Sequence, residues 1–149
     1  MLMTTNQRVE GYRGQGETRG KEILMTLRAL AALFLTTTTL RIYGFKRLHN
    51  MVKDWPIGKI SPVAVELQSE TDLVCRSIKR AMTYSLMPLQ CLRQSAATVC
   101  LLRTRGIGAS LVIGITRFPF TAHAWAEVEG RIVDGPPQLR EFYKEIERM

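Results

Sequence analysis

The stretch CLRQSAATVCLLRTRGIGASLVIGI, residues 91–115, decides the fold, because its hydrophobic period changes halfway along. Up to about Thr104 the apolar residues follow a helical spacing, and Gly106 suits the position just after a helix. From Ala109 onwards, apolar residues alternate with polar or small ones, as in a strand. The stretch therefore predicts a helix that leads directly into a strand.

The predicted helix begins near Pro88. Proline is favoured in the first turn of a helix, where its missing N–H costs no hydrogen bond. The helical spacing is expected to bury Leu92, Ala96, Val99 and Cys100.

Two further strands are predicted at about 121–128 and 131–134, joined by the two-residue turn Glu129-Gly130. Gly135, Pro136 and Pro137 end the sheet, because proline cannot donate a ladder hydrogen bond. The charged tail, residues 139–149, is predicted to be helical. Helices followed by strands indicate the α+β class, with a small antiparallel sheet.

The register of this hairpin predicts which side chains meet. A two-residue turn pairs Val128 with Arg131, so that Trp125 faces Asp134. His123 then lies diagonally from Asp134 on the same face, and diagonal neighbours are roughly 7–8 Å apart.

Other residues near this hairpin are expected to have structural roles. Trp125 is expected in the core or in a pocket wall, and Glu127 is interpreted as a solvated strand residue. His49 is expected to be a structural or surface residue.

Upstream, the composition changes twice. Residues 1–20 are polar and contain four glycines, so they are expected to form a disordered arm. Residues 21–60 form an apolar and basic helical region in which Gly44 marks a stop or kink. Residues 61–149 form the remaining core, with a second helix over about 66–84.

The composition, 46% hydrophobic and 23% charged, is that of a globular domain. Three cysteines spaced by 16 and 9 residues form no disulfide framework and no zinc cluster, so a reducing, cytoplasmic setting without metal or cofactor is expected.

The net charge of +8 gathers in residues 1–60, which hold ten Lys/Arg against four Asp/Glu. This excess can attract nucleic acid, an acidic partner or an anionic membrane, or simply keep the chain soluble. Only twelve uncharged residues separate Arg28 from Arg41, whereas a membrane span needs about 20. No nucleic-acid motif is visible. Neither a nucleic-acid nor a membrane partner is therefore expected.

Cys91, His123 and Asp134 are the candidate catalytic residues. In the first turn of a helix the dipole favours a thiolate, and free N–H groups can hold an oxyanion. His123 is one of only two histidines and could act as the base, with Asp134 orienting its ring. A single cysteine or histidine in such a place is more commonly structural; the shared arrangement favours catalysis.

Residues 91–115, followed by F-x-AHAWAEVEG-x-IVD at 120–134, resemble the transglutaminase-like cysteine peptidases of lasso-peptide biosynthesis. The C-L-x-x-S opening and the A-H-A-W core are its most specific parts. The resemblance implies a transglutaminase/papain-like core over 61–149, with Cys91 as nucleophile, His123 as base and Asp134 as orienting acid. One departure is Gln94, which stands where family members often have an arginine.

The resemblance also implies a function: a thiol protease (leader peptidase) that removes the leader from a ribosomally made precursor peptide. Fused members carry an N-terminal winged-helix recognition domain, for which this chain has no room. It therefore resembles the stand-alone protease half of the B protein, whose partners are a separate small winged-helix leader-recognition protein and an ATP-dependent lasso cyclase.

Three alternatives stay open at this point. The chain could be a catalytically inactive transglutaminase-like module that presents a peptide to partner enzymes, an acyltransferase with the same triad, or a basic nucleic-acid binder. The apolar, basic segment 23–47 is expected either to dock the recognition protein or the leader, or to cover the core.

Overall fold

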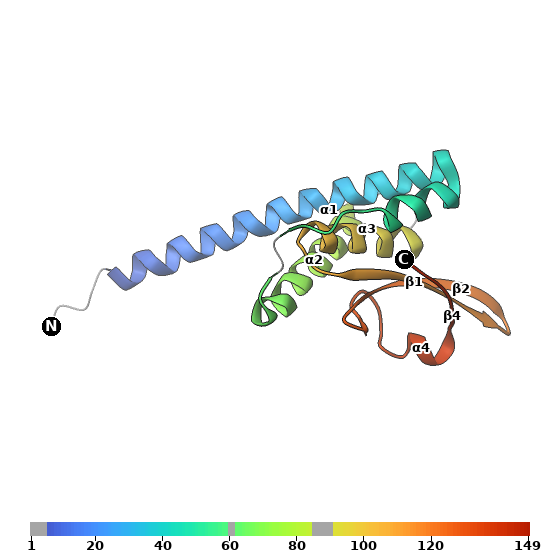
Figure 1. Cartoon of the computed structure of the whole chain (residues 1–149). Helices are drawn as coiled ribbons and strands as arrows, with labels where there is room; N and C mark the ends of the chain where they lie inside the picture. Colours follow the sequence, from blue (N-terminus) through green and yellow to red (C-terminus); the bar gives the residue numbers. More distant parts are fainter. Residues whose placement is uncertain (1–5, 60–61, 85–90) are drawn as a thin grey trace.

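The computed structural model describes residues 6–59, 62–84 and 91–149. Its elements are α1 (Asn6–Lys53), α2 (Ala64–Tyr84), α3 (Cys91–Thr104), β1 (Ala109–Arg117), β2 (Phe120–Val128), β3 (Arg131–Ile132), α4 (Leu139–Phe142) and β4 (Lys144–Arg148). The strands form one antiparallel sheet in the order β3-β2-β1-β4. The helices α1 to α3 cover one face of this sheet, and α4 lies on the other (Figure 1). The predicted α+β class is confirmed.

The kink predicted at Gly44 is confirmed. This residue has φ 78° and ψ −178°, and α1 turns back there (Figure 1). A positive φ suits glycine because it has no Cβ to clash with the backbone. The turn brings the last part of α1 back along its own length, toward α3.

The start of α1 differs from the expectation of a disordered arm over residues 1–20. The helix begins at Asn6, while residues 1–5 lie outside the described residues. Adding residues to an existing helix avoids the cost of nucleation, and arginine, glutamine and glutamate are good helix formers.

Helix α3 ends as predicted. Gly106 has φ 77°, and its N–H donates to the carbonyl oxygen of Arg103 at 2.9 Å. The N–H of Ile107 donates to the carbonyl oxygen of Leu102 at 3.0 Å. Together these bonds make the Schellman pattern, which satisfies the last carbonyl groups of a helix. The predicted start at Pro88 lies outside the described residues.

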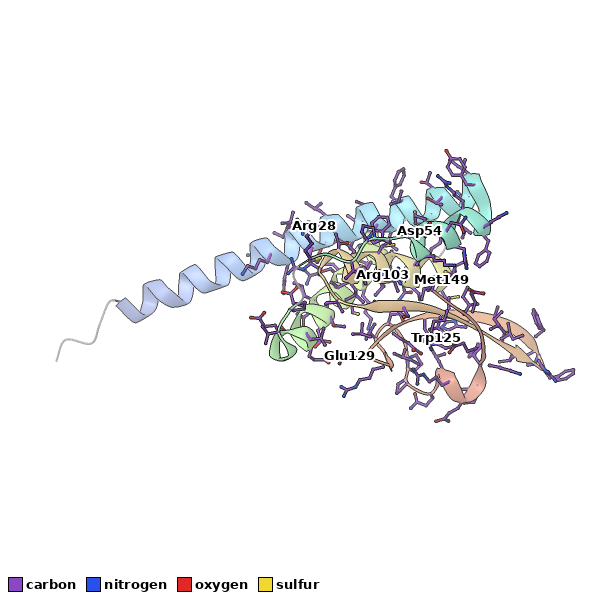
Figure 2. All side chains as sticks on the ribbon, viewed as in Figure 1. Arg28, Asp54, Arg103, Trp125, Glu129 and Met149 are labelled. Atoms are coloured by element: carbon purple, nitrogen blue, oxygen red, sulfur yellow. The ribbon has the colours of Figure 1, made fainter. Side chains whose placement is uncertain are left out.

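The two faces of the sheet carry separate apolar cores. Ala124, Ala126 and Val128 of β2 face the helices, where they meet the buried α3 residues Ala96, Val99 and Cys100; Leu92 is half-buried. On the other face lie Val112, Trp125, Leu139 and the half-buried Tyr143. Trp125 is only 1% exposed and lies on the side of the sheet away from the long helices (Figure 2). Neighbouring residues of β2 therefore point into different cores.

The predicted hairpin register is confirmed. Val128 pairs with Arg131, and Glu127 pairs with Ile132. The turn residue Gly130 has φ 75°, as a tight hairpin turn requires.

Strand β3 is shorter than predicted, because it ends at Ile132 instead of Asp134. The N–H of Val133 donates to the carbonyl oxygen of Ala126 at 3.0 Å. The N–H of Ala126 donates to Asp134 Oδ1 at 2.8 Å instead of to the carbonyl of Val133. Since a regular antiparallel pair exchanges both backbone bonds, the Asp134 side chain replaces a strand carbonyl and ends the ladder.

The prediction of a helical tail over 139–149 is wrong. Helix α4 has only four residues, and β4 then pairs antiparallel with β1. Leu111 and Met149 exchange backbone hydrogen bonds of 2.8 and 2.9 Å. The free edge of β1 supplies the partner for this segment, and strand formation depends more on such context than on local propensity.

Candidate active site

Cys91 is the first residue of α3 and is half-buried. It packs against the core between the sheet and the helices. This end of α3 is held against α1, because the Thr36 hydroxyl donates to the carbonyl oxygen of Arg93 at 3.3 Å. The predicted nucleophile therefore sits on an anchored helix.

The side chain of Asp134 connects α3 with β2. One carboxylate oxygen, Oδ2, lies 2.5 Å from the hydroxyl of Ser95, and the other accepts the N–H of Ala126. Ser95 also lies 3.1 Å from the carbonyl oxygen of Ala124, so it reaches β2 directly. Ser95 follows Cys91 by one helical turn. The carboxylate is therefore tied to the helix that carries Cys91 and to the strand that carries His123.

Ser95 has one hydrogen atom and two acceptors beside it, Ala124 O and Asp134 Oδ2. The shorter contact has the length of a charge-assisted bond, roughly 2.5–2.7 Å between oxygens. Burial raises the pKa of Asp134, while the hydrogen bonds from Ser95 and Ala126 and the charge of His123 act in the opposite direction. The pKa of this half-buried carboxylate is raised on balance, and the Ser95 hydrogen bond limits the rise.

His123 lies half-buried in β2, on the sheet face that carries the aromatic core. Its ring centroid is 5.4 Å from that of Tyr143 and 6.5 Å from that of Trp125, with which it stacks. Among the described residues, no hydrogen bond joins His123 to Asp134 or to Cys91. The structure thus brings Asp134 to α3 and β2, and leaves the imidazole beside the aromatic rings.

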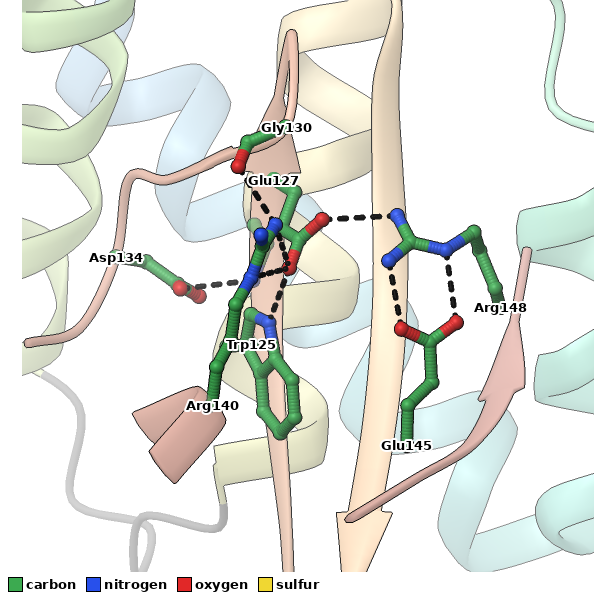
Figure 3. A network of polar contacts seen from close by, with 8 residues as sticks. Trp125, Glu127, Gly130, Asp134, Arg140, Glu145 and Arg148 are labelled. Carbon is green, nitrogen blue, oxygen red and sulfur yellow. Dashed lines mark hydrogen bonds and ion pairs between the residues drawn. The ribbon is translucent and has the colours of Figure 1, made fainter. Parts of the chain in front are cut away.

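The interpretation of Glu127 as a solvated residue is wrong. Its side chain is 2% exposed and accepts hydrogen bonds from Trp125 Nε1 at 2.8 Å, Arg148 Nη1 at 2.8 Å and Arg140 Nε at 3.1 Å (Figure 3). Arg148 also binds Glu145. Burial alone would raise the pKa of Glu127, but these three hydrogen bonds outweigh it and lower the pKa. The network ties α4 and β4 to the strand that carries His123.

Ser95, Tyr143 and Glu127 were not predicted as site residues. The C-L-x-x-S opening contains Ser95, and the spacing H-x-W-x-E contains Glu127 on the face of His123 and Trp125. The sequence therefore contained a signal that could have identified Ser95 and Glu127 as site residues. Tyr143 lies in the tail that was expected to be helical, so nothing placed it near the sheet.

His49 has a structural contact, as expected. Its Nε2 lies 3.2 Å from Glu147 Oε1 and links the last part of α1 to β4. In the part of the chain that the structure describes, no group of three or more His, Cys, Asp or Glu residues could hold a metal ion.

The three thiols are expected to react at different rates. Burial, with a contribution from Asp134, raises the pKa of Cys75 to about 11, and its thiol donates to the carbonyl oxygen of Val133. Burial raises the pKa of Cys100 to about 12. Because the thiolate is the reactive form, iodoacetamide at neutral pH should modify Cys91 first.

Mass spectrometry of tryptic peptides, sampled over time, measures this order. In denaturant all three cysteines should react alike, which is the control. Alkylation of Cys75 at the rate of Cys91 in the folded protein would contradict the expected difference.

Comparison with known proteins places this arrangement in a family. The family model of the transglutaminase-like superfamily matches residues 39–148, well over half of the chain. The microcin J25-processing protein McjB of Escherichia coli is 41% identical over 51 residues, which is 34% of this chain and 24% of that protein. The match thus spans about a quarter of the relative's length. No solved structure matches the chain. The chain therefore belongs to the transglutaminase-like superfamily.

Proposed function

We propose that the protein is a cytoplasmic cysteine peptidase that removes the leader from a ribosomally made precursor peptide during lasso-peptide maturation. The family and the similarity to a microcin-processing protein support this role. The observation that carries the proposal is the position of Asp134. Its carboxylate is bound by Ser95 of the helix that begins at Cys91 and by Ala126 of the strand that contains His123. One half-buried acid thus joins the elements of all three candidate catalytic residues.

In the proposed reaction, His123 removes the proton from the Cys91 thiol, and the sulfur attacks the scissile carbonyl carbon. N–H groups at the start of α3 stabilise the oxyanion. The imidazolium then protonates the departing amine of the core peptide, which leaves the leader as a thioester on Cys91. Water hydrolyses this thioester, releases the leader carboxylate and restores the thiol. Asp134 orients the ring and stabilises its charge.

The mechanism requires the imidazole to come within hydrogen-bond distance of the Cys91 sulfur. In the structure the His123 ring stacks on Trp125 and lies tilted against the ring of Tyr143. Catalytic hydrogen bonds are often long or misaligned without substrate and tighten in the Michaelis complex. A movement that brings His123 and Cys91 together, with substrate in place, is therefore part of the proposal.

Two partners complete the proposed pathway. A separate small winged-helix protein recognises the leader and delivers the precursor. An ATP-dependent lasso cyclase then uses the amine that cleavage exposes.

The proposal is tested by incubating the purified protein with a precursor peptide, with and without the recognition protein, and following the products by mass spectrometry. A peptidase produces the free leader and the core. A catalytically inactive presenting module would bind the precursor and leave it intact. An acyltransferase would transfer the leader to an added amine in preference to water, so an amine-trapping reaction separates it from a hydrolase.

Ser95→Ala is expected to shift the acid limb of the pH profile of cleavage to higher pH. The Ser95 hydrogen bond lowers the pKa of Asp134, so its removal raises that pKa further. Asp134 then becomes protonated, and stops supporting the imidazolium, at a higher pH than in the wild type. The measurement is kcat/KM for the precursor as a function of pH.

Thr98→Val is the matched control, because Thr98 is a buried residue of the same helix whose hydroxyl donates to the carbonyl oxygen of Gln94 and, among the described residues, not to Asp134. It should leave the pH profile in place. An equal shift in both variants would indicate a general loosening of α3 and would remove Ser95 from the mechanism.

A further inference from the structure

Helix α1 is apolar on two opposite sides. Its inner side is buried against the rest of the protein through Met25, Ala29 and Leu33. Its outer side exposes a row of apolar residues at spacings of three, four and eight, which we call the outer stripe: Ile23, Leu27, Ala31, Phe34 and Ile42. The large members of the outer stripe are 55–66% exposed. A contiguous exposed apolar surface of this kind marks an interaction site.

The charge around the outer stripe limits what can cover it. Residues 19–53 contain seven Lys/Arg and one acidic residue, Glu22, which forms an ion pair with Arg80 at 3.5 Å. Arg28 and Arg41 are exposed along the two edges of the stripe, given the 3.6-residue period, and Figure 2 shows Arg28 on α1. A second copy of this chain would place like charges against each other. The surface therefore favours an acidic occupant.

The shape beside the outer stripe favours a peptide. A cavity of about 540 Å³ opens between α1, α3 and the segment after α1; its lining includes Arg28, Ala31, Leu35 and Trp55. Such a hollow can take a projecting side chain. The segment Arg19–Lys53 is long and apolar enough to cross a membrane by length and composition, but 39% of its most apolar window is buried within the protein. A lipid surface would cover the stripe and leave the hollow unfilled.

We infer that the outer stripe is the docking surface for an amphipathic helix of a second protein, with apolar residues on its contact face and Glu or Asp along its edges. Ile23, Leu27, Ala31 and Phe34 lie at positions i, i+4, i+8 and i+11, and such steps of three and four residues are those by which two helices pack. The acidic edges pair with Arg28 and Arg41, as in other helix-in-groove complexes. The outer stripe and the hollow beside it contain none of the candidate catalytic residues, so the inference does not depend on the peptidase activity.

A labelled synthetic helix tests this inference against the full chain. The probe is a peptide of about 21 residues, three heptads, with leucine at the contact positions and glutamate at the flanking positions. Its counterpart carries lysine in place of glutamate. Fluorescence anisotropy should show that the protein binds the glutamate peptide in preference to the lysine peptide. Phe34→Ser should weaken this binding by roughly tenfold or more. The double substitution Arg28→Glu and Arg41→Glu should make the protein bind the lysine peptide in preference to the glutamate peptide.

Matched controls keep the result specific. Phe142 is 67% exposed in α4 and Phe34 is 64% exposed, so Phe142→Ser removes a similar surface elsewhere and should leave binding unchanged. Arg76→Glu, on the exposed side of α2, is the charge control.

Three results would overturn the inference. One is equal binding of both peptides, or of neither. Another is binding of vesicles of equimolar phosphatidylcholine and phosphatidylserine that Phe34→Ser abolishes, because a lipid surface would then be the occupant. The third is self-association in sedimentation experiments that the same substitution removes, which would indicate a second copy. Each of these three results can occur while the protein still cleaves the precursor. Failure of this inference is therefore distinguishable from failure of the proposed function.

Discussion

Cys91→Ala is expected to lower the rate of precursor cleavage about 10⁴-fold or more while leaving precursor binding unchanged. The substitution removes the sulfur on which the proposed thioester forms, and no other described thiol can replace it. Cys75 and Cys100 are held protonated by burial. Single-turnover cleavage with saturating enzyme, followed by mass spectrometry, measures the chemical step. Binding is measured separately with a labelled precursor.

Cys75→Ser is the matched control. The serine hydroxyl can donate to the carbonyl oxygen of Val133 as the Cys75 thiol does, so cleavage should stay within a few-fold of the wild type. Undiminished cleavage by Cys91→Ala would eliminate the covalent mechanism. A wild-type protein that binds the precursor without cutting it would favour the inactive presenting module instead.

Glu127→Gln is expected to destabilise the protein by about 3 kcal/mol, at the lower end of the range for breaking a buried ion pair. A neutral amide has one acceptor oxygen where the carboxylate has two, and its NH₂ group would face a guanidinium donor. The Trp125 N–H, from a side chain that is 1% exposed, competes for that oxygen with Arg140 and Arg148. The loss is limited because both arginine side chains are about half exposed. The free energy of unfolding in urea measures the effect.

The same carboxylate makes stability depend on pH. The pKa of Glu127 is lowered in the folded state, so its contribution is fully present above the ordinary glutamate value of 4.5 and is lost as the pH falls through the lower folded value. Wild-type protein should therefore lose more stability on acidification than Glu127→Gln.

Glu145→Gln provides the comparison for Glu127. Glu145 is 45% exposed, and its ion pair among the described residues is with Arg148. An exposed pair contributes about 0–1 kcal/mol. Equal destabilisation by the two substitutions would mean that Glu127 does not anchor β4.

The sequence predicted the structural surroundings of some of these residues correctly and of others wrongly. Local patterns correctly predicted the end of α3 at Gly106, the kink at Gly44 and the pairing of Val128 with Arg131. Each of these depends on a few neighbouring residues, because a positive φ or a two-residue turn is set within one turn of chain.

The misses share one cause. Glu127 was interpreted as solvated because nothing next to it in sequence could pair with a buried carboxylate. Its hydrogen-bond donors Arg140 and Arg148 are distant in sequence. The tail was expected to be a helix because its own residues do not show that it pairs as a strand. Its partner, β1, lies more than twenty residues upstream. Ser95 stood in the motif, yet its role depends on Asp134, which is 39 residues away.

The sequence by itself determined the family, the α+β class and the helix and hairpin that carry Cys91, His123 and Asp134, since periodicity and turn chemistry are local. Only the tertiary structure decided that Asp134 ends β3 and binds Ser95, that Glu127 holds the C-terminal strand, and that the outer side of α1 stays exposed. Each of these depends on which groups, far apart along the chain, share a low-dielectric interior or remain in water. That is a property of packing, and no window of neighbouring residues contains it.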